Sequence, residues 1–87
     1  MVINKIKYFH DLSVMKSTEK DELLIKLANR VKELRIAKNL TQEDAYNDTG
    51  IHFGRIERGK RDVSFSSLKK ICDYFELSLE EFFSKGF

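Results

Sequence analysis

The sequence contains no proline, no tryptophan, one cysteine and only four glycines in 87 residues. A single cysteine excludes a disulfide framework, and with only His10 and His52 beside it we expect no structural metal site. The absence of proline, together with the small number of glycines, favours helices over sheets and loops. No apolar run approaches the roughly 18 residues of a membrane span, so we expect a soluble, cytoplasmic protein. A chain of this length has room for one core, which predicts one domain.

The net charge is only +2, but it is unevenly distributed along the chain. Residues 1–22 contain equal numbers of basic and acidic side chains, and residues 62–87 contain three basic against five acidic ones. Residues 23–61 contain nine basic side chains against five acidic ones. The total charge is therefore weak evidence for nucleic-acid binding. The uneven distribution, with a basic middle segment and an acidic C-terminal one, is the feature that a proposed function has to account for.

The spacing of apolar residues predicts helices joined by short turns. The first helix is expected over residues 17–38, where apolar side chains recur at three- and four-residue steps: Leu23, Leu24, Leu27, Val31 and Leu34. Asn39 suits a left-handed stop after it. Thr41 with Asp44 resembles a capping box for a second helix, which is polar except for Ala45 and Tyr46. A third, short helix is expected to end at Gly59.

Two further caps complete the expected all-α architecture of five helices. Ser64 caps a fourth helix with an apolar stripe, in which Cys72 is expected to be an inert, packed thiol. Ser78 with Glu81 forms a capping box for the last helix. We expect the helical domain over residues 18–87 and an N-terminal extension over residues 1–17. The first 16 residues fit a strand, an added helical turn or an arm that orders in a dimer.

The middle of the chain contains the functional motif. A short helix, a tight turn and a second short helix bearing Arg55 and Arg58 have the layout of a helix-turn-helix. Over residues 23–84 the sequence resembles the lambda-repressor-like helix-turn-helix family, also called the XRE or Cro family. The matching segments are Arg30-Val31-Lys32-Glu33-Leu34-Arg35, Leu40-Thr41-Gln42-Glu43, Arg55-Ile56-Glu57-Arg58-Gly59-Lys60-Arg61, Leu68-Lys69-Lys70-Ile71-Cys72 and Leu77-Ser78-Leu79-Glu80-Glu81-Phe82-Phe83.

This resemblance implies a compact five-helix DNA-binding domain, usually dimeric, that regulates transcription. It also implies roles for single residues. Gln42, at the start of the second helix, is similar to the family's phosphate-contacting glutamine. Arg35 and Glu57 are similar to an internal ion pair that ties the first helix to the third. Arg55 corresponds to an outward-facing position of the recognition helix, from which the family contacts bases.

The chain departs from the family pattern between Gln42 and Ile56, where it is three residues shorter, about one helical turn. In one placement Gly50 and Ile51 are the turn glycine and its buried aliphatic neighbour, and the recognition helix has lost its first turn. In the other, Asn47 is the left-handed turn residue, Thr49 caps a full-length third helix, and Gly50 and Ile51 face the major groove. We favour the second placement, because shortening the recognition helix is harder to reconcile with DNA binding.

Residue chemistry supplies candidates for contacts with DNA. Arg55 is the candidate for a base contact, because arginine pairs bidentately with guanine, and His52 lies one turn before it. His52 equally fits a residue that covers the start of the helix. The candidates for phosphate contacts are Gln42, Arg58, Lys60 and Arg61, with Arg30, Lys32 and Lys38 as weaker ones. We interpret Gly54, which has no side chain, as the point where two helices cross closely rather than as a point where the backbone approaches DNA.

Phe82, Phe83 and Phe87 give the C-terminal tail more aromatic residues than a small lone domain needs. One of the adjacent pair can be buried, so we assign these residues to a homodimer interface rather than to contacts with the N-terminal segment. No grouping of serine, histidine and carboxylates, and no glycine-rich phosphate loop, points to an enzyme or a cofactor. The predicted function is a transcriptional repressor that binds double-stranded DNA as a homodimer on an inverted repeat. The alternatives are a helical protein-interaction module and an antitoxin-type regulator with a protein partner.

Overall fold

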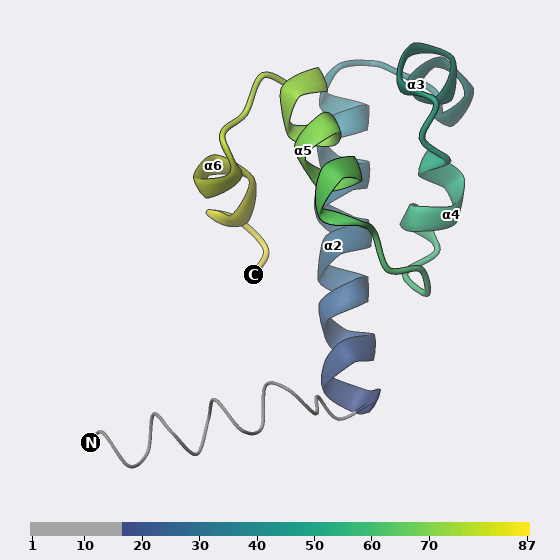
Figure 1. Cartoon of the computed structure of the whole chain (residues 1–87). Helices are drawn as coiled ribbons and strands as arrows, with labels where there is room; N and C mark the ends of the chain where they lie inside the picture. Colours follow the sequence, from purple (N-terminus) through teal and green to yellow (C-terminus); the bar gives the residue numbers. More distant parts are fainter. Residues whose placement is uncertain (1–16) are drawn as a thin grey trace.

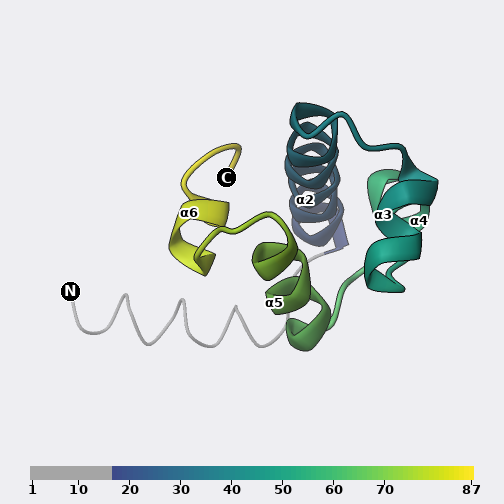
Figure 2. The same cartoon turned by 90° about the horizontal axis from the view of Figure 1, so that it is seen from above.

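The computed structural model describes residues 17–87, which form five helices and no strands (Figure 1). The helices are α2 (Ser17–Ala37), α3 (Gln42–Thr49), α4 (Phe53–Glu57), α5 (Phe65–Tyr74) and α6 (Leu79–Phe83). α3 and α4 lie on one side of α2, α6 lies on the other side, and α5 lies between them (Figures 1 and 2). The all-α, five-helix prediction is confirmed for this part of the chain. The predicted extension over residues 1–17 lies outside the described residues, except for Ser17 at the start of α2.

The predicted caps determine where most of the helices begin and end. Thr41 with Asp44, and Ser78 with Glu81, form complete capping boxes, and the Ser64 hydroxyl accepts a hydrogen bond from the backbone N–H of Ser67. Asn39 ends the turn after α2 with a φ of 56°, which asparagine tolerates better than most residues. None of the helices within residues 17–87 has an apolar stretch long enough to cross a membrane.

The turn between α3 and α4 is formed by Gly50, which has a φ of 76°. Its backbone N–H donates to the carbonyl of Tyr46 and ends α3. Glycine adopts this left-handed conformation without the steric cost that a Cβ imposes. The first of the two placements is therefore correct, and α4, the helix expected to be the recognition helix, is the shortened one. The favoured placement, with a left-handed Asn47, is wrong.

The surroundings of Thr49 explain why that placement fails. Thr49 is a buried residue inside α3 rather than a cap of α4. Its hydroxyl donates to the carbonyl of Ala45 and accepts a hydrogen bond from the backbone N–H of Ile51. Ile51 is half-buried against the core and does not extend toward a ligand. Asn47 lies inside α3, so the short element is the recognition helix.

The core lies where α2, α4 and α5 meet, with α3 and α6 closing its two sides. Its buried side chains include Leu24, Leu27, Val31, Ala45, Phe53, Ile56, Ile71, Cys72, Phe75 and Phe82. Burial raises the pKa of the Cys72 thiol, which agrees with the expected packed and inert cysteine. The Tyr74 hydroxyl of α5 donates to the Asp48 carboxylate of α3 at 2.6 Å, which raises the pKa of Tyr74 to about 12. This bond ties α3 to α5 beside the core.

Arg30 holds the C-terminal helix in place instead of facing a ligand. Its side chain is only 6% exposed, and its Nε and Nη2 donate to the carbonyls of Phe82 and Glu81 at 2.7 and 3.0 Å. Nη1 pairs with Glu33 at 2.7 Å. A cation at the carbonyl end of α6 satisfies acceptors that the short helix leaves free. The assignment of Arg30 as a phosphate candidate is therefore wrong.

Phe82 also differs from its prediction. Its ring is fully buried, beneath the guanidinium of Arg30, whose Cζ lies 5.7 Å from the ring centroid. A side chain in the core is not available to a partner, so the assignment of Phe82 to a dimer interface is wrong. Phe83 and Phe87 remain at the surface and are 44% and 40% exposed. The helical spacing directs one ring of the adjacent pair inward and the other outward.

Candidate nucleic-acid interface

Two buried residues orient the recognition helix α4. Phe53 and Ile56 lie three positions apart on its inner face and are both part of the core. This arrangement leaves His52 and Arg55, also three positions apart, exposed to solvent. α4 has only five residues, so few side chains lie on its outward face, and those at its start form a large part of that face.

Gly54, in α4, lies close to the first residue of α3. A Cβ at this position would lie 3.0 Å from the Oε1 atom of Gln42, which is closer than side chains normally approach. Gly54 thus lies against the end of the Gln42 side chain, and its interpretation as a close crossing of two helices stays a prediction. Gln42, the first residue of α3, is exposed, and its side chain reaches from Gly54 to Glu57 along α4.

Arg35 and Glu57 fasten the end of α4 to α2. The guanidinium makes a bidentate pair with the carboxylate, with Nε to Oε2 at 2.7 Å and Nη2 to Oε1 at 2.9 Å. Nη1 of Arg35 also donates to the carbonyl of Leu40 at 2.7 Å, and the hydrogen bond with Glu57 raises the pKa of Arg35. The Glu57 side chain is only 3% exposed. Its Oε1 accepts a further hydrogen bond from Nε2 of Gln42, so this one carboxylate links α2, α3 and α4.

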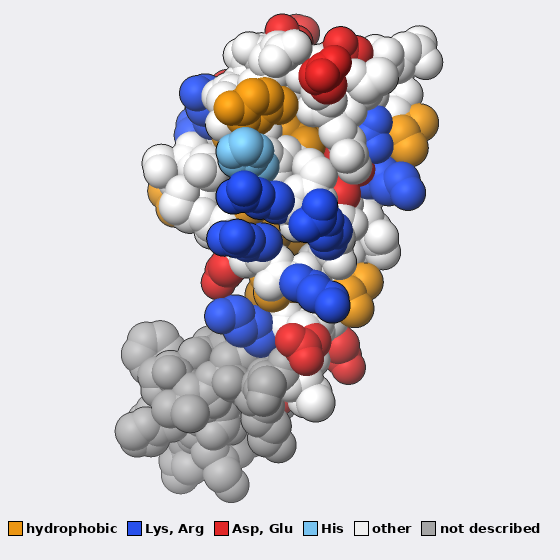
Figure 3. Space-filling view, turned by 90° about the vertical axis from the view of Figure 1, so that its right-hand side faces the viewer, with side chains coloured by type: hydrophobic (Ala, Val, Ile, Leu, Met, Phe, Trp, Pro, Cys, Tyr) orange, Lys and Arg blue, Asp and Glu red, His pale blue; other side chains and the backbone are white. Residues whose placement is uncertain are grey.

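Four cationic side chains surround a shallow hollow at the end of α4. They form what we call the basic cluster: Arg55, Arg58, Lys60 and Arg61. All four are exposed, and Figure 3 shows lysine and arginine side chains gathered on the face formed by α3 and α4. Gly59, with a φ of 77°, turns the chain inside the cluster and packs against Ile25 of α2. The turn brings Lys60 and Arg61 back beside Arg55 and Arg58.

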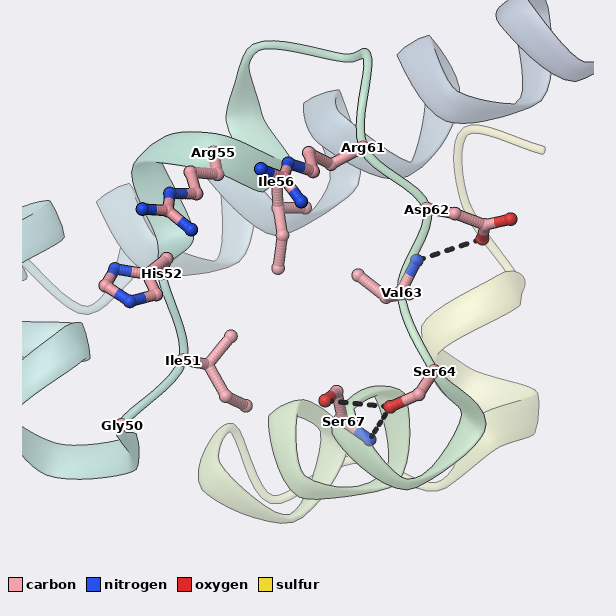
Figure 4. A pocket seen from close by; sticks show the side chains of 10 residues that line it. All are labelled: Gly50, Ile51, His52, Arg55, Ile56, Arg61, Asp62, Val63, Ser64 and Ser67. Atoms are coloured by element: carbon pink, nitrogen blue, oxygen red, sulfur yellow. Dashed lines mark hydrogen bonds between the residues drawn. The ribbon is translucent and has the colours of Figure 1, made fainter.

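A second hollow separates α4 from the start of α5 (Figure 4). Ile51, Ile56 and Val63 point into it, whereas Arg61 lies at its rim. On the α5 side the Ser64 hydroxyl accepts a hydrogen bond from the backbone N–H of Ser67 and donates one to the Ser67 hydroxyl. The lining thus combines apolar side chains with the cations of Arg55 and Arg61 and the carboxylate of Asp62.

An aromatic pair at the start of α4 escaped the sequence reasoning. The rings of Tyr46 and His52 stack with centroids 4.6 Å apart and an angle of 26° between their planes. His52 is the N-cap residue of α4, but its side chain makes no capping hydrogen bond. Tyr46 is the only aromatic residue of α3, which is polar apart from Ala45 and Tyr46. It lies four positions after Gln42, and this spacing, which places both side chains on one face of α3, was the feature of the sequence that could have indicated a role for Tyr46.

The predicted site residues thus fall into three groups. The structure brings together Arg55, Arg58, Lys60 and Arg61 as one cluster. His52 directly precedes α4, and the Gln42 side chain lies along α4, against Gly54 and Glu57. Arg35 and Glu57 lie behind it as an ion pair. The third group, Phe83 and Phe87, lines an apolar groove with Leu23, Leu24, Leu27, Asp62, Val63 and Leu68. No group of three or more possible metal ligands occurs within residues 17–87.

Comparison with known proteins agrees with this geometry. A family model described as helix-turn-helix matches residues 31–82, which is more than half of the chain. No curated protein and no solved structure shows a significant match. The matched segment spans the end of α2 through α6 and includes both helices of the motif. The chain therefore belongs to the lambda-repressor-like (XRE-type) helix-turn-helix family of DNA-binding transcription regulators.

Proposed function

We propose that this chain is a repressor that binds an inverted-repeat operator in double-stranded DNA as a homodimer. α4 enters the major groove, with Arg55 and His52 at base edges. Gln42, Arg58, Lys60 and Arg61 contact phosphates on both sides of the groove. The bound dimer blocks transcription because it occupies the promoter.

The basic cluster is the observation that supports this proposal most strongly. Its four cations are exposed, lie beside the recognition helix and have no acidic residue among the lining of their hollow. Neutralising phosphates releases counterions, and this term supplies most of the affinity of such proteins for DNA. The position of Arg55 at the junction of the cluster and α4 suits a guanine contact.

The apolar groove supports the homodimer. Phe83 and Phe87 line it together with leucines of α2 and α5 and with Asp62 and Val63, which precede α5, and no residue of α3 or α4 lines it. A second copy on this groove covers the exposed rings while leaving both basic clusters free. Two-fold symmetry then predicts half-sites about one helical turn, roughly 34 Å, apart or a multiple of it.

Arg55→Ala and Lys60→Ala should weaken DNA binding in different ways. Loss of a bidentate base contact is expected to cost about 1–3 kcal/mol at one base pair of each half-site, with little effect on random duplex. Loss of a phosphate contact should weaken binding to all sequences and reduce the slope of log K against log salt by about 0.9 for each half-site. Fluorescence anisotropy over a salt series, with a duplex selected from a random pool, measures both effects.

Lys85→Ala is the matched control, because it removes an exposed cation near α6, outside the basic cluster. It should leave the salt slope unchanged. Equal losses on selected and random duplex for Arg55→Ala would contradict its base-reading role. Absent or salt-insensitive binding by the wild-type chain would favour the protein-interaction module over the DNA-binding proposal.

Phe83→Asp should disrupt the homodimer. A carboxylate placed in an apolar interface without a partner is costly to desolvate, so the dimer dissociation constant should rise at least about tenfold. Sedimentation equilibrium measures this change. Phe65→Asp is the control, because Phe65 is exposed on α5 but does not line the groove. A dimer that persists in Phe83→Asp as in Phe65→Asp would contradict this interface.

A further inference from the structure

The stacked side chains of Tyr46 and His52 lie outside the hydrophobic core and make no evident contribution to the stability of the fold. Tyr46 remains 42% exposed although its ring is large and apolar, and it is not part of the core. His52 is exposed as well and does not cap α4 through its side chain. The two rings stack on each other at the surface, with centroids 4.6 Å apart. Rings ordered in advance lose little conformational entropy when they bind a partner.

The pair lies directly before the short recognition helix. α4 begins directly after His52, so no helical residue precedes Arg55 by more than two positions. Tyr46 comes from α3, one turn after Gln42, and covers His52 from that side. On this face a hydrophobic side chain, a histidine and the basic side chains follow one another (Figure 3).

We infer that the Tyr46–His52 pair is a specificity element that packs against the C5-methyl group of a thymine in the major groove, next to the base pair that Arg55 contacts. This inference rests on the proposed function and deepens it. The thymine methyl is the apolar group that the major groove presents, and apolar side chains recognise it by contact. Contact between a ring face and this methyl group depends on which base is present, so it contributes to sequence preference.

The geometry also explains how a five-residue recognition helix selects a sequence. Arg55 contributes the polar contact from α4, and the pair contributes an apolar contact from α3 and the turn. Because Tyr46 and Gln42 lie on the same face of α3, a phosphate contact at Gln42 sets the depth at which the Tyr46 ring meets the bases. The reading surface is therefore shared by two helices.

Removal of single methyl groups from the DNA tests the inference. A duplex is first selected from a random pool by the full-length wild-type chain, and each thymine is then replaced by deoxyuridine in turn. One position in each half-site should weaken wild-type binding about fourfold, the loss expected for one buried methyl-sized group. Tyr46→Ala should bind the thymine and deoxyuridine duplexes equally, whereas Tyr46→Phe, which keeps the ring, should retain the fourfold difference.

His52→Ala should reduce the methyl effect, because Tyr46 then loses the ring that orients it. Thermal melts followed by circular dichroism establish that each variant is folded, and the thymine replacements in the wild-type complex need no variant at all. A selected sequence without any methyl-sensitive position, or Tyr46→Ala with an unchanged methyl effect, would overturn the inference while the proposed function stands. A wild-type chain that selects no sequence would overturn both.

Discussion

Replacing Glu57 with alanine is expected to lower the free energy of unfolding by about 3–5 kcal/mol. The substitution leaves the guanidinium of Arg35 without its bidentate partner in a nearly buried site, where that side chain is only 11% exposed. It also removes the acceptor of the Gln42 amide, so α2, α3 and α4 lose their common link at once. For a domain of this size each kcal/mol corresponds to roughly 4–8 °C in Tm.

Urea denaturation followed by circular dichroism measures this loss. Asp73→Ala is the matched control, because Asp73 pairs with Lys69 on the exposed face of α5. An exposed pair four residues apart on a helix contributes only about 0.3–0.5 kcal/mol. If Glu57→Ala costs no more than Asp73→Ala, the Arg35–Glu57 pair does not hold the recognition helix in place.

Phe53→Ala is expected to cost a similar amount, about 3–5 kcal/mol, by emptying the centre of the core. The Phe53 ring is fully buried and meets Tyr74 and Phe75 edge to face, with centroids 6.3 and 6.1 Å away. Phe53 is also the first residue of α4, so its loss frees the end of the recognition helix that bears His52. DNA affinity should therefore fall even at temperatures where the variant remains folded.

The same denaturation experiment, with anisotropy on a selected duplex, separates the two effects. Phe65→Ala is the control, because the Phe65 side chain is 71% exposed and its truncation should change stability by no more than about 0.5 kcal/mol. Similar losses for the two variants would mean that Phe53 does not anchor α4.

Local chemistry made most of the helix boundaries predictable. The caps at Thr41, Ser64 and Ser78 act within three residues of themselves, so their hydrogen bonds depend little on the rest of the fold. The left-handed conformations of Asn39 and Gly59 are equally local. The apolar spacing indicated which face of each longer helix is buried. Such features can be predicted from one sequence because the interactions that produce them join residues within one helical turn.

The errors arose where the outcome depends on residues far apart. Gly50 rather than Asn47 turns the chain, and Thr49 lies inside α3, where its side chain is buried by the packing of the helices. Arg30 has the spacing of a surface cation, but the carbonyls of α6, 51 and 52 residues later, bind its guanidinium. That contact also places Phe82 inward. No local pattern marks an arginine as the support of a distant helix end.

The sequence by itself determined the number and order of the helices in residues 17–87, the turn chemistry and the helix-turn-helix identity. The helices and turns follow from short-range hydrogen bonding and from the period of the apolar residues, and the helix-turn-helix identity follows from the resemblance of residues 23–84 to that family. Only the tertiary structure decided which cations face outward and which helix is short, and it alone brought Tyr46 against His52. Those outcomes require contacts between separate helices, because burial and charge pairing are set by the neighbours that folding brings together.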